Sequence, residues 1–172
     1  MLPKVLCLHG YAQNIFVDAP HLIPGNKRDN CYSKFSARDK ELIGVNGMRC
    51  WWDYNSISYL TLVLNSIRYI NQVIDNHGPF IGIIGFSQGA CLAFILNNLI
   101  ESNSPLINKS QKSLNFIVLY SGFFPSDRRV NNIVTKKSFN TPSLIVLDNT
   151  GRDKVVKAEK TLYLERLLKN SG

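Results

Sequence analysis

A serine with a glycine two positions away on each side is the strongest chemical signal in this sequence. The segment Gly85-Phe86-Ser87-Gln88-Gly89 follows an apolar run typical of a strand and precedes a run typical of a helix. This spacing in this context predicts a nucleophile elbow, in which the tight strand-to-helix turn strains Ser87 and projects its hydroxyl above the sheet. Side chains at the two glycine positions would collide, so both must be small. We therefore predict that Ser87 is a catalytic nucleophile; the alternative is an ordinary glycine-flanked turn.

Two backbone amides are candidates for an oxyanion hole beside this serine. Gln88 begins the predicted helix, so its N–H is free of a helical acceptor and lies at the positive end of the helix dipole. His9-Gly10-Tyr11 follows the first apolar run, where such folds supply the second donor. We predict the backbone N–H groups of Tyr11 and Gln88 as the pair. Removing one such donor typically costs about 2.7–4 kcal/mol of transition-state stabilisation.

A serine nucleophile also needs a carboxylate that orients a histidine. Asp153, in Gly151-Arg152-Asp153, follows the apolar run 143–147, which is where the acid belongs in the chain order serine, acid, histidine. Asp148 lies nearer to the end of that run and is the competing candidate. We favour Asp153, and an ordinary loop aspartate is the alternative for either position.

The histidine of such a triad is not identifiable in the sequence. His9, His21 and His77 all precede Ser87, and no histidine follows it. His77 comes before the strand that leads to Ser87 and is therefore expected at the opposite edge of the sheet. His9 and His21 follow strand ends on the productive edge, but a structural role is the expectation for each.

The rest of the chain supplies the elements that must position these residues. Continuously apolar runs predict buried strands, and 3.6-residue periodicity predicts amphipathic helices. Strands that alternate with helices predict an α/β domain with a mostly parallel sheet and helices on both faces. The expected strands are 4–8, 15–17, 80–86, 114–120 and 143–147, and the expected helices are 56–76, 88–101 and 155–168.

We expect residues 1–172 to form a single domain, in which 24–50 is a long loop or lid because it is polar and lacks a sustained period. No apolar run approaches the length of a membrane span, and no signal-peptide core is present, so a cytoplasmic protein without membrane association is expected. The net charge of +8 is scattered without a nucleic-acid motif, so we expect no nucleic-acid partner. The four cysteines and three histidines show no metal-ligand spacing, and we expect neither metal nor cofactor.

Taken together, the motifs resemble a family of serine hydrolases first described in yeast, within the α/β-hydrolase superfamily. The resemblance rests on segments spread over most of the chain, namely Lys4–Asn14, Asp18-Ala19-Pro20-His21, Trp51-Trp52, Asn76–Phe80, Gly85–Ala90 and Tyr120–Phe123. Gly-Phe-Ser-Gln-Gly alone is also similar to acyl-protein thioesterases, the less favoured assignment. The resemblance implies a carboxylesterase-type reaction on a small-molecule ester, with Ser87 and Asp153 in the triad.

The chain departs from that family in two places and looks truncated beside it. The helix between the Gln13-Asn14 and Asp18-Ala19-Pro20 segments is missing, and so are the C-terminal strand and its histidine loop. A catalytically impaired remnant that still binds acyl groups is therefore the alternative function. Trp51, Trp52 and Phe123 are candidates for the wall of an acyl pocket, although ordinary packing also accounts for them. The oligomeric state is left open.

Overall fold

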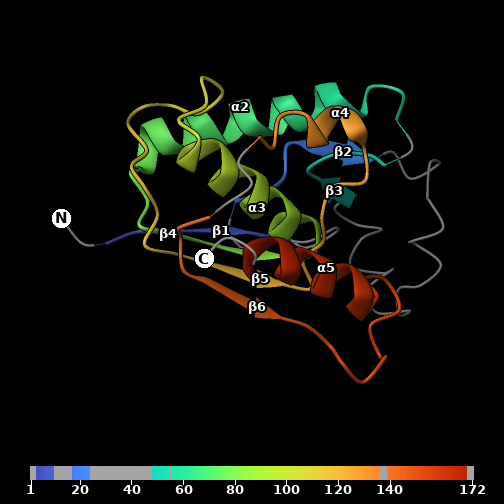
Figure 1. Ribbon diagram of the computed structural model, residues 1–172. Coiled ribbons are helices and arrows are strands. Elements are labelled where there is room, and N and C mark those ends of the chain that lie inside the picture. The colour runs from blue at the N-terminus through green and yellow to red at the C-terminus, as the bar shows by residue number, and fades with distance from the viewer. Residues whose placement is uncertain (1–2, 10–16, 24–47, 55, 136–138, 170–172) are drawn as a thin grey trace.

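A four-stranded parallel sheet forms the centre of the computed structural model, which describes residues 3–9, 17–23, 48–54, 56–135 and 139–169. The strand order is β1-β4-β5-β6 (Figure 1). These strands are β1 (Val5–Leu8), β4 (Gly82–Phe86), β5 (Phe116–Tyr120) and β6 (Ser143–Val146). Because all four run in the same direction, their carboxyl ends, including the end of β4 that leads into Ser87, meet at one edge of the sheet.

Three helices connect and cover these strands. They are α2 (Tyr59–His77), α3 (Gln88–Glu101) and α5 (Ala158–Lys169). The periodic apolar stripe of α2 becomes its buried face, whereas α3 is buried from Gln88 to Leu99 and is the central helix of the domain. Both helices lie over the sheet in Figure 1.

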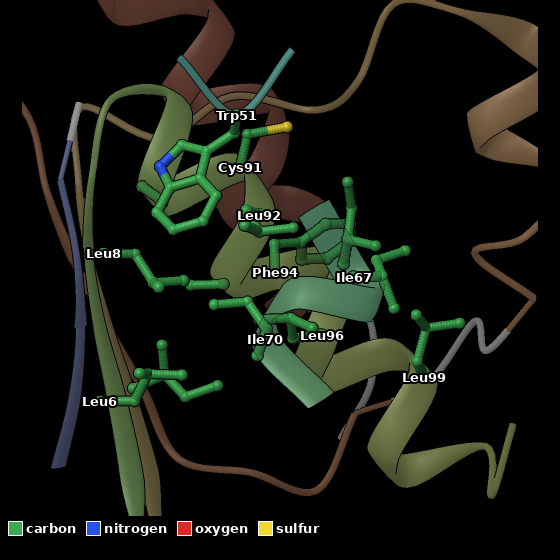
Figure 2. Packing of buried hydrophobic residues seen from close by; sticks show 14 of the residues in the cluster. Leu6, Leu8, Trp51, Ile67, Ile70, Cys91, Leu92, Phe94, Leu96 and Leu99 are labelled. Carbon is green, nitrogen blue, oxygen red and sulfur yellow. The ribbon is translucent and has the colours of Figure 1, made fainter. Parts of the chain in front are cut away.

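The core lies between one face of the sheet and these helices. Figure 2 shows Leu6 and Leu8 of β1 directed toward the apolar side chains of α2 and α3. The β5 residues Ile117 and Leu119 are fully buried in the same cluster, and Leu164 brings α5 into it. The alternation of side chains along each strand therefore places one set of strand residues in a closed core.

The sequence predicted the central elements well and the small ones poorly. The mostly parallel sheet with helices is confirmed. Two short strands, β2 (His21–Ile23) and β3 (Met48–Cys50), pair antiparallel and were not expected, and neither was the four-residue helix α4 (Arg128–Asn131). The predicted lid at 24–50 falls mostly outside the described residues, but its last three residues form β3. From the expected strand at 15–17, only Val17 is described, and it makes a single parallel bridge to Leu8.

Candidate active site

Ser87 occupies a backbone conformation that ordinary residues avoid. It lies between β4 and α3 with φ 52° and ψ −114°. A positive φ at a residue with a Cβ is strained and persists only where the surroundings enforce it. Here the Ser87 N–H donates to the Tyr120 carbonyl at 2.8 Å, and the Ser87 carbonyl accepts from the Cys91 N–H at 3.1 Å. The neighbouring strand and the first turn of α3 thus hold the half-buried serine at the carboxyl edge of the sheet.

The two glycines of the motif allow backbone segments to approach each other. A Cβ on Gly85 would lie 2.5 Å from the Gly89 carbonyl oxygen and 2.6 Å from the Ala90 Cα. A Cβ on Gly89 would lie 2.3 Å from the carbonyl oxygens of both Leu8 and His9. Gly85 therefore lets α3 turn back over β4, and Gly89 lets α3 approach the end of β1.

The Gln88 backbone N–H is available to donate a hydrogen bond to an anion. Gln88 is the first residue of a 14-residue helix, so its amide has no acceptor within the helix and lies at the positive end of the dipole. This amide belongs to the residue directly after Ser87. The second predicted donor, Tyr11, falls in 10–16 and lies outside the described residues.

The Gln88 side chain fastens the elbow to the segment that follows β3. It is 1% exposed; its Oε1 accepts from the Trp51 N–H and its Nε2 donates to the Trp52 carbonyl, both at 2.8 Å. The Trp51 indole in turn donates to the His9 carbonyl at 2.9 Å. Trp51 consequently links the start of α3 to the end of β1, the two places from which oxyanion donors are expected. Sequence reasoning named Gln88 only for its backbone and did not foresee this connection.

Aromatic side chains gather beside the elbow. Trp52 lies 6.0 Å from Tyr59 and 6.2 Å from Tyr54, and Tyr54 lies 6.2 Å from Phe123, all between ring centroids. Tyr54 thus contacts both Trp52 and Phe123, and Trp51 packs against His9; Trp51 and Trp52 are both fully buried. Tyr54 and Tyr59 were missed, although Tyr54 is two residues from Trp52.

The polar ends of two of these aromatics are unusual. Trp52 Nε1 and the Tyr59 hydroxyl are buried and have no hydrogen-bond partner among the residues that the structure describes. Burial, with smaller effects from Cys91 and Asp127, raises the pKa of Tyr59. The Tyr59 hydroxyl is therefore neutral at physiological pH.

The two candidate acids make different hydrogen bonds. Asp148 accepts from the Thr150 N–H at 2.8 Å, from the Thr150 hydroxyl, and from the Asp153 N–H at 2.7 Å. Asp153 accepts from the Val155 and Val156 amides through Oδ1 alone. Within the described part of the chain, Asp153 Oδ2 therefore has no donor. Asp148 shapes the loop, and Asp153 is the acid with an oxygen free to accept an imidazole N–H.

Asp148 gives the loop a testable pH dependence. Its hydrogen bonds, first to the Thr150 hydroxyl and then to backbone amides, lower its pKa to about 2. Because the folded-state pKa lies below the unfolded value of about 3.9, its stabilisation is complete above pH ~4 and is lost as the pH falls through about 2. We expect Asp148→Asn to unfold at lower urea concentration than wild type at pH 5, and the difference to shrink toward pH 2. A constant difference across this range would contradict the assignment.

The described histidines are engaged elsewhere. His9 is 3% exposed, and its Nε2 accepts from the Ala19 N–H at 2.8 Å. His21 Nε2 lies 3.0 Å from the Leu62 carbonyl oxygen, so in this bond the imidazole donates. His77 ends α2, ahead of β4, and its carbonyl accepts from Lys4. The structural roles expected for all three are consistent with these contacts.

Other sites in the described residues do not compete with the elbow. The described residues contain no group of three or more acidic, histidine or cysteine side chains arranged to hold a metal ion. No described helix combines the length and apolar character needed to cross a membrane. A groove of about 1030 Å³ lies at the far end of α3, lined in part by Leu99, Glu101 and Thr141, and it does not include Ser87.

Comparisons with known proteins agree with this geometry. The family described as "Serine hydrolase (FSH1)" matches residues 11–171. The esterase OVCA2 of Danio rerio is 30% identical over an alignment of 152 positions, which covers 70% of this chain and 64% of that protein. The esterase CG5412 of Drosophila melanogaster is 28% identical over an alignment of 186 positions, which covers 98% of this chain and 64% of that protein. The chain thus spans a little under two thirds of the length of these relatives.

Solved structures show the same fold at lower identity. Acyl-protein thioesterase 2 of Zea mays superimposes with a TM-score of 0.66 at 18% identity, covering 99% of this chain and 80% of the other. The esterase PE8 gives a TM-score of 0.56 at 17% identity, with coverages of 98% and 77%. The fold is therefore that of α/β-hydrolase esterases and thioesterases. Since the family match extends over nearly the whole chain and includes the elbow, this protein belongs to the FSH1 serine hydrolase family.

Proposed function

We propose that this chain is a carboxylesterase-type serine hydrolase whose nucleophile is Ser87. The observation that carries the proposal is the strained Ser87 conformation at the start of α3, enforced from both sides by backbone contacts. Backbone strain of this kind clusters at functional sites, where the surrounding structure enforces it. The relatives named as esterases support a small-molecule ester as the substrate class.

In the proposed reaction Ser87 Oγ attacks the ester carbonyl. The oxyanion that develops accepts a hydrogen bond from the Gln88 N–H, and from the Tyr11 N–H as the sequence predicts. An imidazole accepts the serine proton and delivers it to the departing alcohol, which leaves the acyl group on Ser87. A water molecule then gives a proton to the same imidazole and attacks this acyl-enzyme, which releases the carboxylic acid and returns the proton to Ser87 Oγ. Asp153 Oδ2 accepts the second N–H of that imidazole, while Oδ1 stays bonded to the Val155 and Val156 amides.

No described histidine is free to serve as this imidazole, so turnover by the chain alone is expected to be slow. A site that keeps its oxyanion donors but lacks its base retains only a small residual rate. The second candidate function, an acyl-binding protein that does not turn over, rests on the same observation.

The test is labelling with a fluorophosphonate probe, with and without added imidazole. We expect slow labelling of wild type that imidazole accelerates about tenfold or more, because it supplies the missing proton acceptor. Ser87→Ala is expected to remain unlabelled under both conditions. As a matched control, Ser121→Ala removes a hydroxyl from another positive-φ serine and should label like wild type.

The outcomes separate the two candidates. Equal labelling of wild type and Ser87→Ala would refute the assignment of the nucleophile. No labelling of folded wild type, even with imidazole, would refute the hydrolase and leave the acyl-binding function, which a fatty-acid titration followed by tryptophan fluorescence then checks.

A further inference from the structure

The imidazole of His9 joins three parts of the chain. His9 directly follows β1, and the residue is almost completely buried. Its Nε2 accepts from the backbone N–H of Ala19 at 2.8 Å, and Ala19 is itself fully buried. The ring also packs against the indole of Trp51, with 5.5 Å between the ring centroids. The His9 side chain therefore holds together the end of β1, the segment around Ala19 and the segment that follows β3.

The backbone of His9 connects the same residue to the elbow. Its carbonyl accepts from the Trp51 indole N–H at 2.9 Å, and Figure 2 shows the nitrogen of that indole directed toward β1. The backbone N–H of Trp51 donates in turn to the Gln88 side chain at 2.8 Å. Gln88 is the residue directly after Ser87. Two hydrogen bonds through Trp51 thus lead from His9 to the start of α3.

The segment that ends at Ala19 is attached to β1 in two places. Val17 forms a parallel bridge with the last residue of β1, and the Ala19 N–H binds the His9 ring. The Ala19 carbonyl accepts from Arg49 Nη1 at 3.1 Å, which joins the segment to β3 as well. The two flanks of residues 10–16, which lie outside the described residues, are therefore fixed next to each other. Tyr11, the predicted second oxyanion donor, belongs to that stretch of the sequence.

The direction of the Ala19 hydrogen bond determines the protonation state of His9. A ring nitrogen accepts a hydrogen bond only while it carries no proton, so His9 must be neutral, with its proton on Nδ1. A proton on Nε2 would face the Ala19 N–H and leave that buried donor without an acceptor, which is costly. His21 has the opposite arrangement, because its Nε2 donates to the Leu62 carbonyl. Protonation preserves the bond of His21 and breaks the bond of His9.

The charges near the ring give an imidazolium little support. The titratable residues on the segments that contact the ring are Cys7, Asp18, Arg49, Cys50, Asp53 and Cys91. Arg49 binds the carbonyl of Ala19, and its positive charge opposes a second cation nearby. Asp18 is exposed and Asp53 is half-buried, so water screens both carboxylates. Burial raises the pKa of the Cys7 and Cys91 thiols, which therefore stay uncharged.

We propose that His9 is a positioning residue for the reaction at Ser87 and that it acts only in its neutral form. The proposal rests on the function proposed above for Ser87. The neutral ring binds Ala19 and supports Trp51, and Trp51 holds the start of α3 through Gln88. When the ring gains a proton, the Ala19 bond breaks and the charged ring has to leave its buried place, so Trp51 loses the group that it packs against.

This arrangement links folding to pH. An unfolded histidine gains its proton near pH ~6.5, whereas folded His9 gains one only by breaking the Ala19 bond. Below that pH the unfolded chain therefore binds one proton more than the folded chain. The contribution of His9 to stability is complete above pH ~6.5 and is lost as the pH falls below it. A difference of one proton changes the equilibrium constant of unfolding about tenfold per pH unit.

Urea unfolding of wild type and His9→Gln between pH 5 and 8 tests this link. Glutamine is long enough to place its Oε1 near the position of Nε2 and to accept from the Ala19 N–H, but it does not titrate in this range. We expect the unfolding constant of wild type, divided by that of His9→Gln, to be constant above pH ~7 and to rise about tenfold per pH unit below pH ~6. The matched control is His77→Gln, because His77 is exposed at the end of α2 and its replacement should keep the wild-type profile.

Probe labelling at pH 8 in the presence of imidazole tests the positioning role. His9→Leu has no acceptor for the Ala19 N–H, and we expect its folded fraction to label about tenfold more slowly than wild type. His9→Gln restores the acceptor and is expected to label within about twofold of wild type. Rescue by glutamine distinguishes loss of this hydrogen bond from loss of the ring as such.

Three results would overturn the proposal. A ratio of unfolding constants that stays the same from pH 5 to 8 would refute the requirement for a neutral ring. Labelling of His9→Leu at the wild-type rate, or of His9→Gln as slowly as His9→Leu, would refute the positioning role. Absence of any labelling of wild type would refute the nucleophile and with it the positioning role, whereas the unfolding ratio would still decide whether His9 must be neutral.

Discussion

Replacing Gly89 with alanine is expected to destabilise the fold by about 3 kcal/mol or more and to abolish probe labelling of Ser87. The new Cβ would lie 2.3 Å from the carbonyl oxygens of Leu8 and His9. Both obstacles are backbone atoms at the end of β1, so no side-chain rotation relieves the contact. Overpacking of a well-packed interior already costs 1–3 kcal/mol where side chains are able to adjust. Here α3 must move away from the sheet, and the nucleophile moves with it. Urea denaturation followed by circular dichroism measures the loss.

Gly82→Ala is the matched control for this prediction. Its Cβ would also be crowded, at 2.5 Å, but the obstacle is the Phe116 ring. Phe116 is only partly buried and lies outside the core cluster, so its ring is able to turn aside. We therefore expect a smaller destabilisation and retention of labelling. If the two alanine variants behave alike, the close approach of α3 to β1 is not what holds the elbow.

Gln88→Leu is expected to destabilise the protein by about 3 kcal/mol and to slow probe labelling about tenfold in the protein that remains folded. Leucine fills a similar volume but leaves the Trp51 N–H and the Trp52 carbonyl without partners in a buried site. Each unsatisfied buried group costs about 1–3 kcal/mol. Labelling slows because the amide of residue 88 is no longer held relative to Ser87, and small misplacements of catalytic groups carry large rate penalties.

The control is the same change on an exposed helical position. Gln72→Leu, on the exposed side of α2, replaces a glutamine without removing a buried contact and should leave both properties near wild type. Trp51→Phe adds a finer test, because it removes only the indole bond to the His9 carbonyl. A Gln88→Leu variant with the stability and the labelling rate of wild type would show that the Gln88 side chain contributes to neither property.

The apolar patterns and turn residues of the sequence predicted those helices and strands that are long enough to show such a pattern. The helix Gln88–Glu101 was predicted with the bounds observed, because apolar residues run through it and the elbow fixes its start. The strands around it were placed within a few residues. By contrast, β2 and β3 have three residues each, too few for an alternating pattern to appear. These two strands form by pairing with each other, and this pairing depends on how distant parts of the chain pack in the fold and not on their own residues.

The candidate site was predictable where function follows from local spacing and not where it depends on distant contacts. The spacing of Ser87 and its two glycines is enough to predict the tight turn between strand and helix. The sequence favoured Asp153 over Asp148 by position alone; the hydrogen bonds that distinguish the two carboxylates depend on how 148–156 folds back on itself. The bond from the Gln88 side chain to Trp51 spans 37 residues, and no sequence spacing encodes it.

The conformation of Ser87 has a consequence for how this protein responds to selection. A non-glycine residue at φ 52° and ψ −114° carries an internal cost of about 1–3 kcal/mol, which glycine would not bear. A laboratory search for heat-tolerant variants, blind to chemistry, would accordingly favour glycine at position 87 and discard the hydroxyl. Robustness and reactivity pull in opposite directions at this one residue.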